Sequence, residues 1–384
     1  MRPAFWTAAR LASLALSTSL AACAHTETAP VEIPNNPPFG DGVWPRPITF
    51  NQFDDRHPQW LPDGSGIIYS TEREDQQFDR DRCIALLPPE GGSQRWRKCE
   101  VDGRHVDTTD VYEWPSVSPT GDAVFIHTSG WRLLKKTGRP RIALAHGFDF
   151  EHSRVVRTLP FFSNSGKQQV LGWTFRWIAP DQLVYLGVLE FFQGSTFLPD
   201  TFFTGQEVML LHIIDDSTSN FTAVPGTEWA SSVAVGDDST AIYYTIGGDS
   251  LVYRRHLMTG AVDTVHNFGY RRVVRDVSVR GNKLAAIVGD STIFSYEAAH
   301  AGWVQRDEGG GISVVDLTTG VEVSYDLAPI WLFRHPEISP DGHRLVVEAQ
   351  PYAVPTLSVL SGFNATNHRA DLWLFSLDDA PLAP

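Results

Sequence analysis

A short turn sequence, Ser-Pro-Asp-Gly, recurs along this chain in a constant setting. Its clearest copy is residues 339–342, which lie between a segment opening with His-Pro and an alternating apolar run at 345–348. Residues 62–64 repeat Pro-Asp-Gly after another His-Pro pair, and residues 118–121 read Ser-Pro-Thr-Gly. Proline presets its own φ, aspartate caps the turn and glycine accepts a positive φ, so each copy predicts a β-hairpin.

Three weaker copies fill the interval between these hairpins, at residues 179–181, 236–238 and 280–282. Each lies between two short apolar runs. The six turns follow one another at roughly 45 to 60 residues, which is the length of a four-stranded propeller blade with its loops. The sequence therefore predicts an all-β fold, a six-bladed β-propeller of four-stranded antiparallel blades.

Such a ring needs a closing strand. Residues 371–377 read as the third strand of the sixth unit and the sequence stops soon after them, whereas residues 47–50 form a short apolar run before the first unit. We expect this N-terminal strand to complete the last blade, which closes the ring and removes both open sheet edges. The propeller is then expected to cover residues 47–380.

The motif His-Pro-x-Trp-x-Pro-Asp-Gly at residues 57–64, followed by a β-run, resembles the TolB-like propeller repeat. The same repeat forms the propeller domains of the dipeptidyl-peptidase and prolyl-oligopeptidase group, and the resemblance extends over about residues 46–380. It implies the fold strongly and the function weakly, because one fold hosts many functions. In the TolB family the propeller docks a peptidoglycan-associated partner, so the resemblance implies a protein-binding role. A counterpart of that family's separate N-terminal domain is not evident.

The first residues predict export and lipid attachment. Arg2 and Arg10 precede an apolar stretch at 11–20 that is too short to cross a bilayer. The Leu-Ala-Ala-Cys that follows resembles the bacterial lipobox, which makes residues 1–22 a lipoprotein signal peptide and Cys23 the lipidated residue. An ordinary signal peptide cut just before that cysteine is the alternative.

Residues 23–46 are rich in proline and read as an extended, lipidated tether. Because alanine rather than aspartate follows the cysteine, the pattern resembles outer-membrane sorting. We expect an anchor in the bacterial cell envelope, with the propeller facing the periplasm or the cell surface. The formal net charge of −14 disfavours nucleic acid and anionic membrane surfaces as partners, although solubility alone would account for it.

Two further cysteines, Cys83 and Cys99, flank a Pro-Pro-Glu-Gly-Gly-Ser turn and are symmetric about Gly91. They could therefore face each other across the third and outer strands of the first unit, and an exported protein can keep such a disulfide. Two free thiols are the alternative.

Catalytic signatures are missing from the sequence. It contains no Gly-x-Ser-x-Gly, no His-Glu-x-x-His, no phosphate-binding loop and no zinc-type cysteine spacing. The paired aspartates fall at predicted turns and lack the calcium-loop pattern. We therefore predict no catalytic residues, no cofactor and no metal site.

Apolar insertions indicate a binding face. They interrupt the blades opposite the Ser-Pro-Asp-Gly turns, at residues 190–206 and 350–368. Long apolar insertions on a repeat scaffold usually mark where a partner binds, and packing of the insertions against one another is the alternative. The predicted partner-binding residues are Phe191, Phe192, Phe197, Phe202, Phe203, Tyr352, Leu357 and Phe363.

Connections between blades approach the central channel from the same face. They supply arginine and tryptophan, which can hold an anionic or peptide ligand because arginine forks bind carboxylates and tryptophan stacks. Packing and pairing between blades is the alternative, and it is favoured for His57 and His335, which occupy the same repeat position. The predicted mouth residues are Arg56, Arg176, Trp229, Arg275 and Arg334.

These patterns predict an envelope lipoprotein that acts as a non-catalytic scaffold or accessory subunit of a membrane-associated complex. Its partner is expected to be an envelope or membrane protein, and the lipid on Cys23 its link to the membrane. The alternative is a propeller that binds a small ligand or peptide at the channel mouth, or cleaves it as a hydrolase or lyase.

Overall fold

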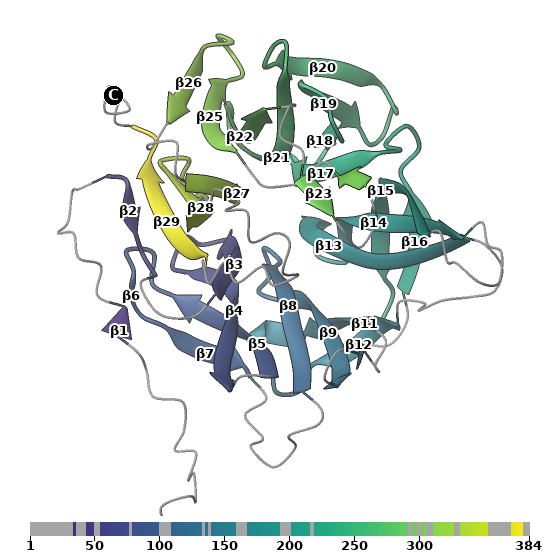
Figure 1. The fold of residues 1–384 in the computed structure, drawn as a ribbon, viewed down its shortest axis with the longest axis vertical. Coiled ribbons are helices and arrows are strands. Elements are labelled where there is room, and N and C mark those ends of the chain that lie inside the picture. The colour runs from purple at the N-terminus through teal and green to yellow at the C-terminus, as the bar shows by residue number, and fades with distance from the viewer. Residues whose placement is uncertain are drawn as a thin grey trace, which may run out of the picture.

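The computed structural model describes residues 34–35, 44–49, 54–76, 79–99, 109–132, 135–136, 140–158, 167–192, 201–215, 219–290, 295–297, 302–304, 310–325, 331–351 and 370–378. Nearly all of these residues are in strands, which form six four-stranded antiparallel blades around a central axis (Figure 1). The predicted six-bladed β-propeller is thereby confirmed. This part of the chain holds no helix that is long and apolar enough to cross a membrane.

Each blade is a meander that runs from an inner strand at the axis to an outer strand at the rim. Blade one consists of β3 (Asp54–Trp60), β4 (Ile67–Gln76), β5 (Asp79–Leu87) and β7 (Arg95–Lys98). Blade two consists of β8 (Thr109–Val117), β9 (Ala123–Arg132), β11 (Pro140–Ala145) and β12 (Arg154–Thr158). Blade three consists of β13 (Lys167–Ala179), β14 (Gln182–Phe192), β15 (Thr201–Ile213) and β16 (Ser219–Ala223). Blade four consists of β17 (Ala230–Val235), β18 (Ala241–Ile246), β19 (Leu251–His256) and β20 (Val262–Asn267). Blade five consists of β21 (Arg272–Arg280), β22 (Lys283–Asp290), β25 (Gly311–Asp316) and β26 (Glu322–Tyr325). Blade six consists of β27 (Trp331–Ile338), β28 (Arg344–Pro351), β29 (Asp371–Ser376) and β2 (Arg46–Pro47).

A few short elements lie outside this scheme. They are a 3₁₀ turn at His146–Phe148, β10 (Lys135–Lys136) against β9, the pair β1 (Pro34–Asn35) and β6 (Gly92–Ser93), and the pair β23 (Ser295–Glu297) and β24 (Gly302–Val304).

The predicted turns join the first two strands of the blades. In the clearest copy, the N–H of Gly342 donates to the carbonyl of Ser339 at 2.9 Å, and the φ of the glycine is 77°. Gly64 and Gly121 have φ angles of 72° and 93° in the other two clear copies. Glycine is the residue that adopts such angles without a steric penalty, so the sequence at these turns directly specifies the hairpins.

The ring closes as predicted, with an N-terminal strand on the last blade. Strand β2 pairs with β29, so that Arg46 lies opposite Leu374, and the N–H of Ile48 donates to the carbonyl of Leu372 at 2.8 Å. The strand starts at Arg46, one residue before the expected boundary. Arg46 is only 2% exposed and forms an ion pair with Glu90 of the first blade, which fastens the closing strand across the seam.

The apolar core is divided around the ring. Six clusters of buried side chains fill the six spaces between neighbouring blades. Ile68 of blade one and Phe125 of blade two belong to one cluster, and Ile287 of blade five and Phe333 of blade six to another. Burial of apolar area stabilises by roughly 25 cal/mol per Å². Apolar contacts between neighbouring blades therefore stabilise the ring, and polar groups can occupy the axis.

The disulfide is present. Cys83 in β5 and Cys99, which directly follows β7, are bonded with a Cα–Cα distance of 4.6 Å. The bridge joins the third and outer strands of blade one, as the symmetric spacing predicted.

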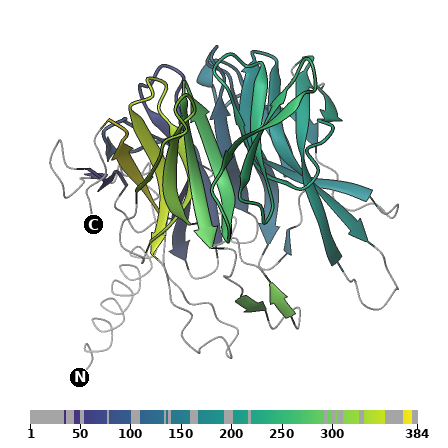
Figure 2. The ribbon, with the colours of Figure 1, turned by 90° about the horizontal axis from the view of Figure 1, so that it is seen from above.

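The two faces of the propeller differ. One carries the turns between the first and second strands, and the other, which we call the insertion face, carries the connections between the second and third strands. The pair β23 and β24 projects below the blades on the insertion face, and the ends of β14 and β15 extend from blade three on the same side (Figure 2). The described parts of the predicted insertion at 190–206, which belong to β14 and β15, therefore lie on the insertion face.

Candidate functional site at the channel axis

Every inner strand contains a bulge at the same depth in the channel. The register of each inner strand shifts by one extra residue against the second strand of its blade. In four blades a residue inside the shift has a positive φ, and these residues are His57 at 55°, Trp114 at 55°, Thr174 at 61° and His335 at 46°. A positive φ is strained for a non-glycine residue, and a bulge redirects its side chain. Strain repeated at one depth favours a functional use of this layer.

Three of the redirected rings meet at the axis. His57 stacks on Trp114 with ring centroids 3.4 Å apart, and His335 contacts both of them edge-on at 4.8 Å and 4.9 Å. These side chains come from blades one, two and six, and blades six and one are neighbours only because the ring is closed. Together with Glu348, described next, they form what we call the axial cluster.

Glu348 lies under the rings and is 1% exposed. It belongs to β28, and its Oε2 atom lies 2.7 Å from Nδ1 of His335 and accepts the N–H of His57 at 3.4 Å. Burial by itself would raise the pKa of Glu348, but His335, Arg56 and His57 outweigh burial and hold that pKa well below its usual range. Its Oε1 atom is buried and has no hydrogen-bond partner among the described residues.

A chain of polar contacts continues from the cluster into blades five and four. Asp276 accepts the N–H of His335 at 3.0 Å, and the hydroxyl of Ser232 donates to the other oxygen of the same carboxylate. The N–H of Val277 donates in turn to Ser232 at 3.0 Å. Residues at or beside the bulges of five consecutive blades are thus connected around the axis.

Polar contacts cross the channel between this cluster and the turn face. Arg176 of blade three reaches Glu337 of blade six on the opposite side of the ring, at 2.8 Å. The side-chain amide of Gln59 donates to the carbonyl of Phe175 at 3.0 Å, again across the axis. Burial raises the pKa of Glu337, although Arg176 acts to lower it. We call Arg176, Glu337 and Gln59 the plug.

The predicted mouth residues are divided between these two layers. Arg56 and Arg334 lie beside the axial cluster, with Arg56 2.6 Å from Asp54, and Arg275 is buried in the inner strand of blade five. Arg334 is directly opposite Glu348 in the register of blade six. Arg176 belongs to the plug, and Trp229 is 55% exposed just before β17. The structure thus brings two of the five, Arg56 and Arg334, to the cluster.

The predicted partner-binding residues are only partly within the described chain. Phe191 pairs with Phe202, and Phe192 and Phe203 occupy the same two strands of blade three. The predicted residues that fall outside the described residues are Cys23, Phe197, Tyr352, Leu357 and Phe363.

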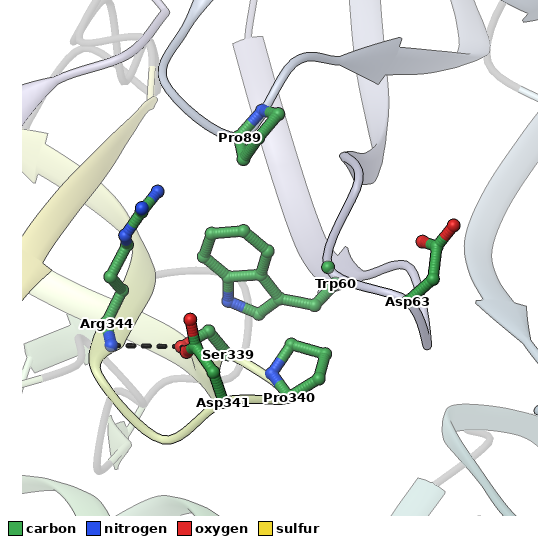
Figure 3. A pocket seen from close by; sticks show the side chains of 8 residues that line it. Trp60, Asp63, Pro89, Ser339, Pro340, Asp341 and Arg344 are labelled. Atoms are coloured by element: carbon green, nitrogen blue, oxygen red, sulfur yellow. Dashed lines mark hydrogen bonds between the residues drawn. The ribbon is translucent and has the colours of Figure 1, made fainter.

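A cavity of about 370 Å³ lies on the turn face, between the turns of blades one and six. Trp60 forms its floor, with Pro89 and Pro340 on either side (Figure 3). Its charged groups are already used, because Asp63 accepts hydrogen bonds from Ser65, Asp341 is bonded to Ser339, and Arg344 forms an ion pair with Glu90. This cavity lies where the first and last blades meet. Its polar groups are engaged in the hydrogen bonds and the ion pair of the turns that line it.

Sequence reasoning missed the carboxylates of the site. The other residues of the run 345–349 around Glu348 are buried and apolar. Acidic residues are rarely buried without a partner, so an acid inside such a strand indicates a buried polar contact. Asp276 and Ser232 carried no comparable signal, because their repeat copies are degenerate. Among the described residues, His57, His335 and Glu348 are also the one group of three possible metal ligands, with ligand atoms all within 4.8 Å of one another.

Comparison with known proteins gives a likeness of fold. The sequence matches no family model and no curated protein. Among solved structures, TolB from Acinetobacter baumannii is similar at 13% identity and a TM-score of 0.48, over 83% of this chain and 65% of that one. A gluconolactonase from Xanthomonas campestris is similar at 12% and 0.49, over 86% and 89%. The PQQ-bound aldose sugar dehydrogenase of Streptomyces coelicolor is similar at 13% and 0.45, over 86% and 96%. At these identities no function is carried over.

Proposed function

We propose that the protein is a cell-envelope binding protein that holds a small anionic ligand or a peptide carboxylate at the channel mouth. The observation that supports this best is the axial cluster, in which two imidazoles, an indole and a buried carboxylate converge on one point. A propeller needs no polar cluster there for stability, since its core lies between the blades. This assigns the protein the alternative function considered from the sequence, without a catalytic step.

The charge around the cluster favours an anion. Arg56 is close enough to Glu348 to lower its pKa, and Arg334 lies opposite Glu348 in the strand register. Guanidinium forks bind carboxylates in two-point contacts, and an indole such as Trp114 supplies a flat apolar wall. Because the contacts of the plug cross the channel on the turn-face side, the ligand would enter from the insertion face.

Thermal unfolding of the full-length, detergent-solubilised protein tests this proposal. The panel comprises short peptides with free or amidated C-termini, sugar acids and dicarboxylates. We expect one class to raise the melting temperature by about 5 °C at saturation. Trp114→Ala should abolish the rise, whereas Tyr270→Ala, which removes a ring that is 93% exposed, should leave it unchanged. A panel without effect, or an effect that persists in Trp114→Ala, would contradict the proposal.

Docking of an envelope protein is the second candidate function, and blade three favours it. Its strands β14 and β15 have 11 and 13 residues, which is longer than the usual five or six of a strand. The added length carries Phe191 opposite Phe202. A photoreactive residue at position 202 should capture one defined envelope protein in native membranes, and the same residue at position 270 should not. Equal capture at both positions would remove this candidate.

The envelope location is proposed from the sequence alone. An alkyne-bearing fatty acid supplied to growing cells should label the wild-type chain through Cys23, and Cys23→Ser should remove the label. Labelling that persists in the variant would contradict a lipid anchor at this residue.

A further inference from the structure

We propose that His57, His335 and Glu348 bind a first-row transition-metal dication such as Zn²⁺ at the channel axis. This inference rests on the proposed function, because it names what the channel mouth holds and what the anionic ligand would meet there. The sequence alone predicted no metal site, since its ligands lie in β3, β27 and β28 at opposite ends of the chain.

The spacing of the three side chains suits such an ion. Their ligand atoms all lie within 4.8 Å of one another, and Nδ1 of His335 is 2.7 Å from Oε2 of Glu348. In a tetrahedral zinc site with bonds of about 2.1 Å, neighbouring ligand atoms are about 3.4 Å apart. The observed spacings bracket that value, so small side-chain rotations would complete the site.

The donor set selects the class of metal. Two imidazole nitrogens and one carboxylate are typical ligands of Zn²⁺, Fe²⁺, Co²⁺ and Mn²⁺, whereas Ca²⁺ and Mg²⁺ prefer oxygen donors throughout. Three protein ligands also leave a coordination position for water or for an oxygen of a bound anion. The metal would therefore serve as the anchor for the ligand at the mouth.

An unsatisfied oxygen provides independent support. Oε1 of Glu348 is fully buried and has no hydrogen-bond partner among the described residues, while Oε2 is bonded to His335 and to the N–H of His57. A buried carboxylate oxygen without a partner is costly. A cation between the carboxylate and the two rings would satisfy it.

The surroundings resemble an outer coordination shell. Oδ2 of Asp276 lies 3.9 Å from Nε2 of His335, and the carboxylate is held by Ser232 and by the backbone N–H of His335. Metal-bound imidazoles commonly point their second nitrogen at such a carboxylate, which fixes the tautomer and the ring orientation. Trp114 covers the face of His57 at 3.4 Å and fixes that ring.

The test uses the full-length protein in mild detergent, stripped with a chelator and dialysed. Zn²⁺ binding is measured by competition with a chelating dye, and Co²⁺ binding by its visible absorption. We expect one Zn²⁺ per wild-type chain. Glu348→Gln and His335→Gln should each weaken binding by more than about 100-fold, and Asp276→Asn by about 10-fold. His212→Gln is the matched control, because it removes an exposed histidine that lies 2.9 Å from Asp181; it should leave the affinity unchanged.

Two results would overturn the inference: a wild-type chain that binds no Zn²⁺, or binding that survives both Glu348→Gln and His335→Gln. Circular dichroism accompanies each titration to check that the variants are folded. If Glu348→Gln and His335→Gln are not folded, the milder Asp276→Asn is the deciding variant. In that case an unchanged affinity in folded Asp276→Asn counts against the site.

Failure of the metal and failure of the ligand site can be told apart. The ligand panel is repeated on stripped and Zn²⁺-loaded protein. If a ligand raises the melting temperature of the stripped protein and Zn²⁺ does not bind, the proposed function stands and only the metal inference is lost. If Zn²⁺ binds as expected and no ligand acts on either form, the proposed ligand class is lost.

Discussion

The plug and the axial cluster occupy adjacent layers of one channel and use neighbouring positions of the same repeat, but they differ in how their carboxylates are compensated. In the plug, Oε2 of Glu337 makes no hydrogen bond among the described residues, but it lies 2.8 Å from the guanidinium of Arg176 across the ring. In the cluster, Oε1 of Glu348 has no hydrogen bond among the described residues, and strained residues hold two imidazoles beside the carboxylate.

The difference separates a structural layer from a binding layer. The ion pair of the plug compensates two opposite charges across the ring and links opposite blades. An incompletely satisfied carboxylate under strained rings costs stability, and folds retain such arrangements where they serve a site. We therefore predict that the two layers respond to substitution in opposite ways.

The largest effect on stability is expected in the plug. Arg176→Met leaves the largely buried Glu337, whose side chain is 19% exposed, without its partner, and should lower the free energy of unfolding by about 3 kcal/mol. Adding Glu337→Leu should recover most of the loss, because an apolar pair of similar volume carries no desolvation penalty. Chemical denaturation of the two variants measures both. A single variant as stable as the wild type would show that the plug is dispensable.

An intermediate effect is expected at the seam between blades one and six. Trp60 is 7% exposed, and its Nε1–H donates to the carbonyl of Glu337 at 3.0 Å. Trp60→Phe removes that donor and part of the buried ring and should cost about 2 kcal/mol. Ligand and metal affinities, measured alongside, should stay at wild-type values. A parallel loss of affinity would mean that the cavity above Trp60 belongs to the site.

The smallest effect on stability is expected in the axial cluster itself. Glu348→Gln keeps the shape of the side chain and an acceptor for His335, so the chelator-treated protein should lose about 1 kcal/mol or less. The same substitution is expected to weaken Zn²⁺ binding by more than about 100-fold. A cost as large as that of Arg176→Met would make the cluster a structural layer like the plug, which is the role that the repeat position of His57 and His335 suggested from the sequence.

The sequence was sufficient for the architecture because its turns carry the information locally. Proline, aspartate and glycine at residues 62–64 and 339–342 define hairpins wherever they occur, and their period gives the number of blades. The closing strand was predicted from the missing fourth strand of the sixth unit, and the Cys83–Cys99 bridge from the symmetric spacing of the two cysteines. Even the proximity of His57 and His335 follows from ring closure, which makes blades one and six neighbours.

The site could not be predicted from the sequence in the same way, because it depends on backbone conformations that the residue types do not indicate. The bulges turn His57, Trp114 and His335 toward the axis, and positive φ angles at such residues are not visible in the sequence. Arg176 was expected at the mouth because arginine suits anions, but its partner Glu337 lies on the opposite blade. The distinction between mouth and plug depends on that single pairing.

The most direct test of the account is a crystal structure of the full-length protein soaked in Zn²⁺, with anomalous data collected on both sides of the zinc absorption edge. We predict one strong peak on the channel axis, about 2.1 Å from a ring nitrogen of His57, a ring nitrogen of His335 and an oxygen of Glu348. No peak there, with Glu348 still bonded only to His335 and to the N–H of His57, would contradict the assignment of the axial cluster as a binding site.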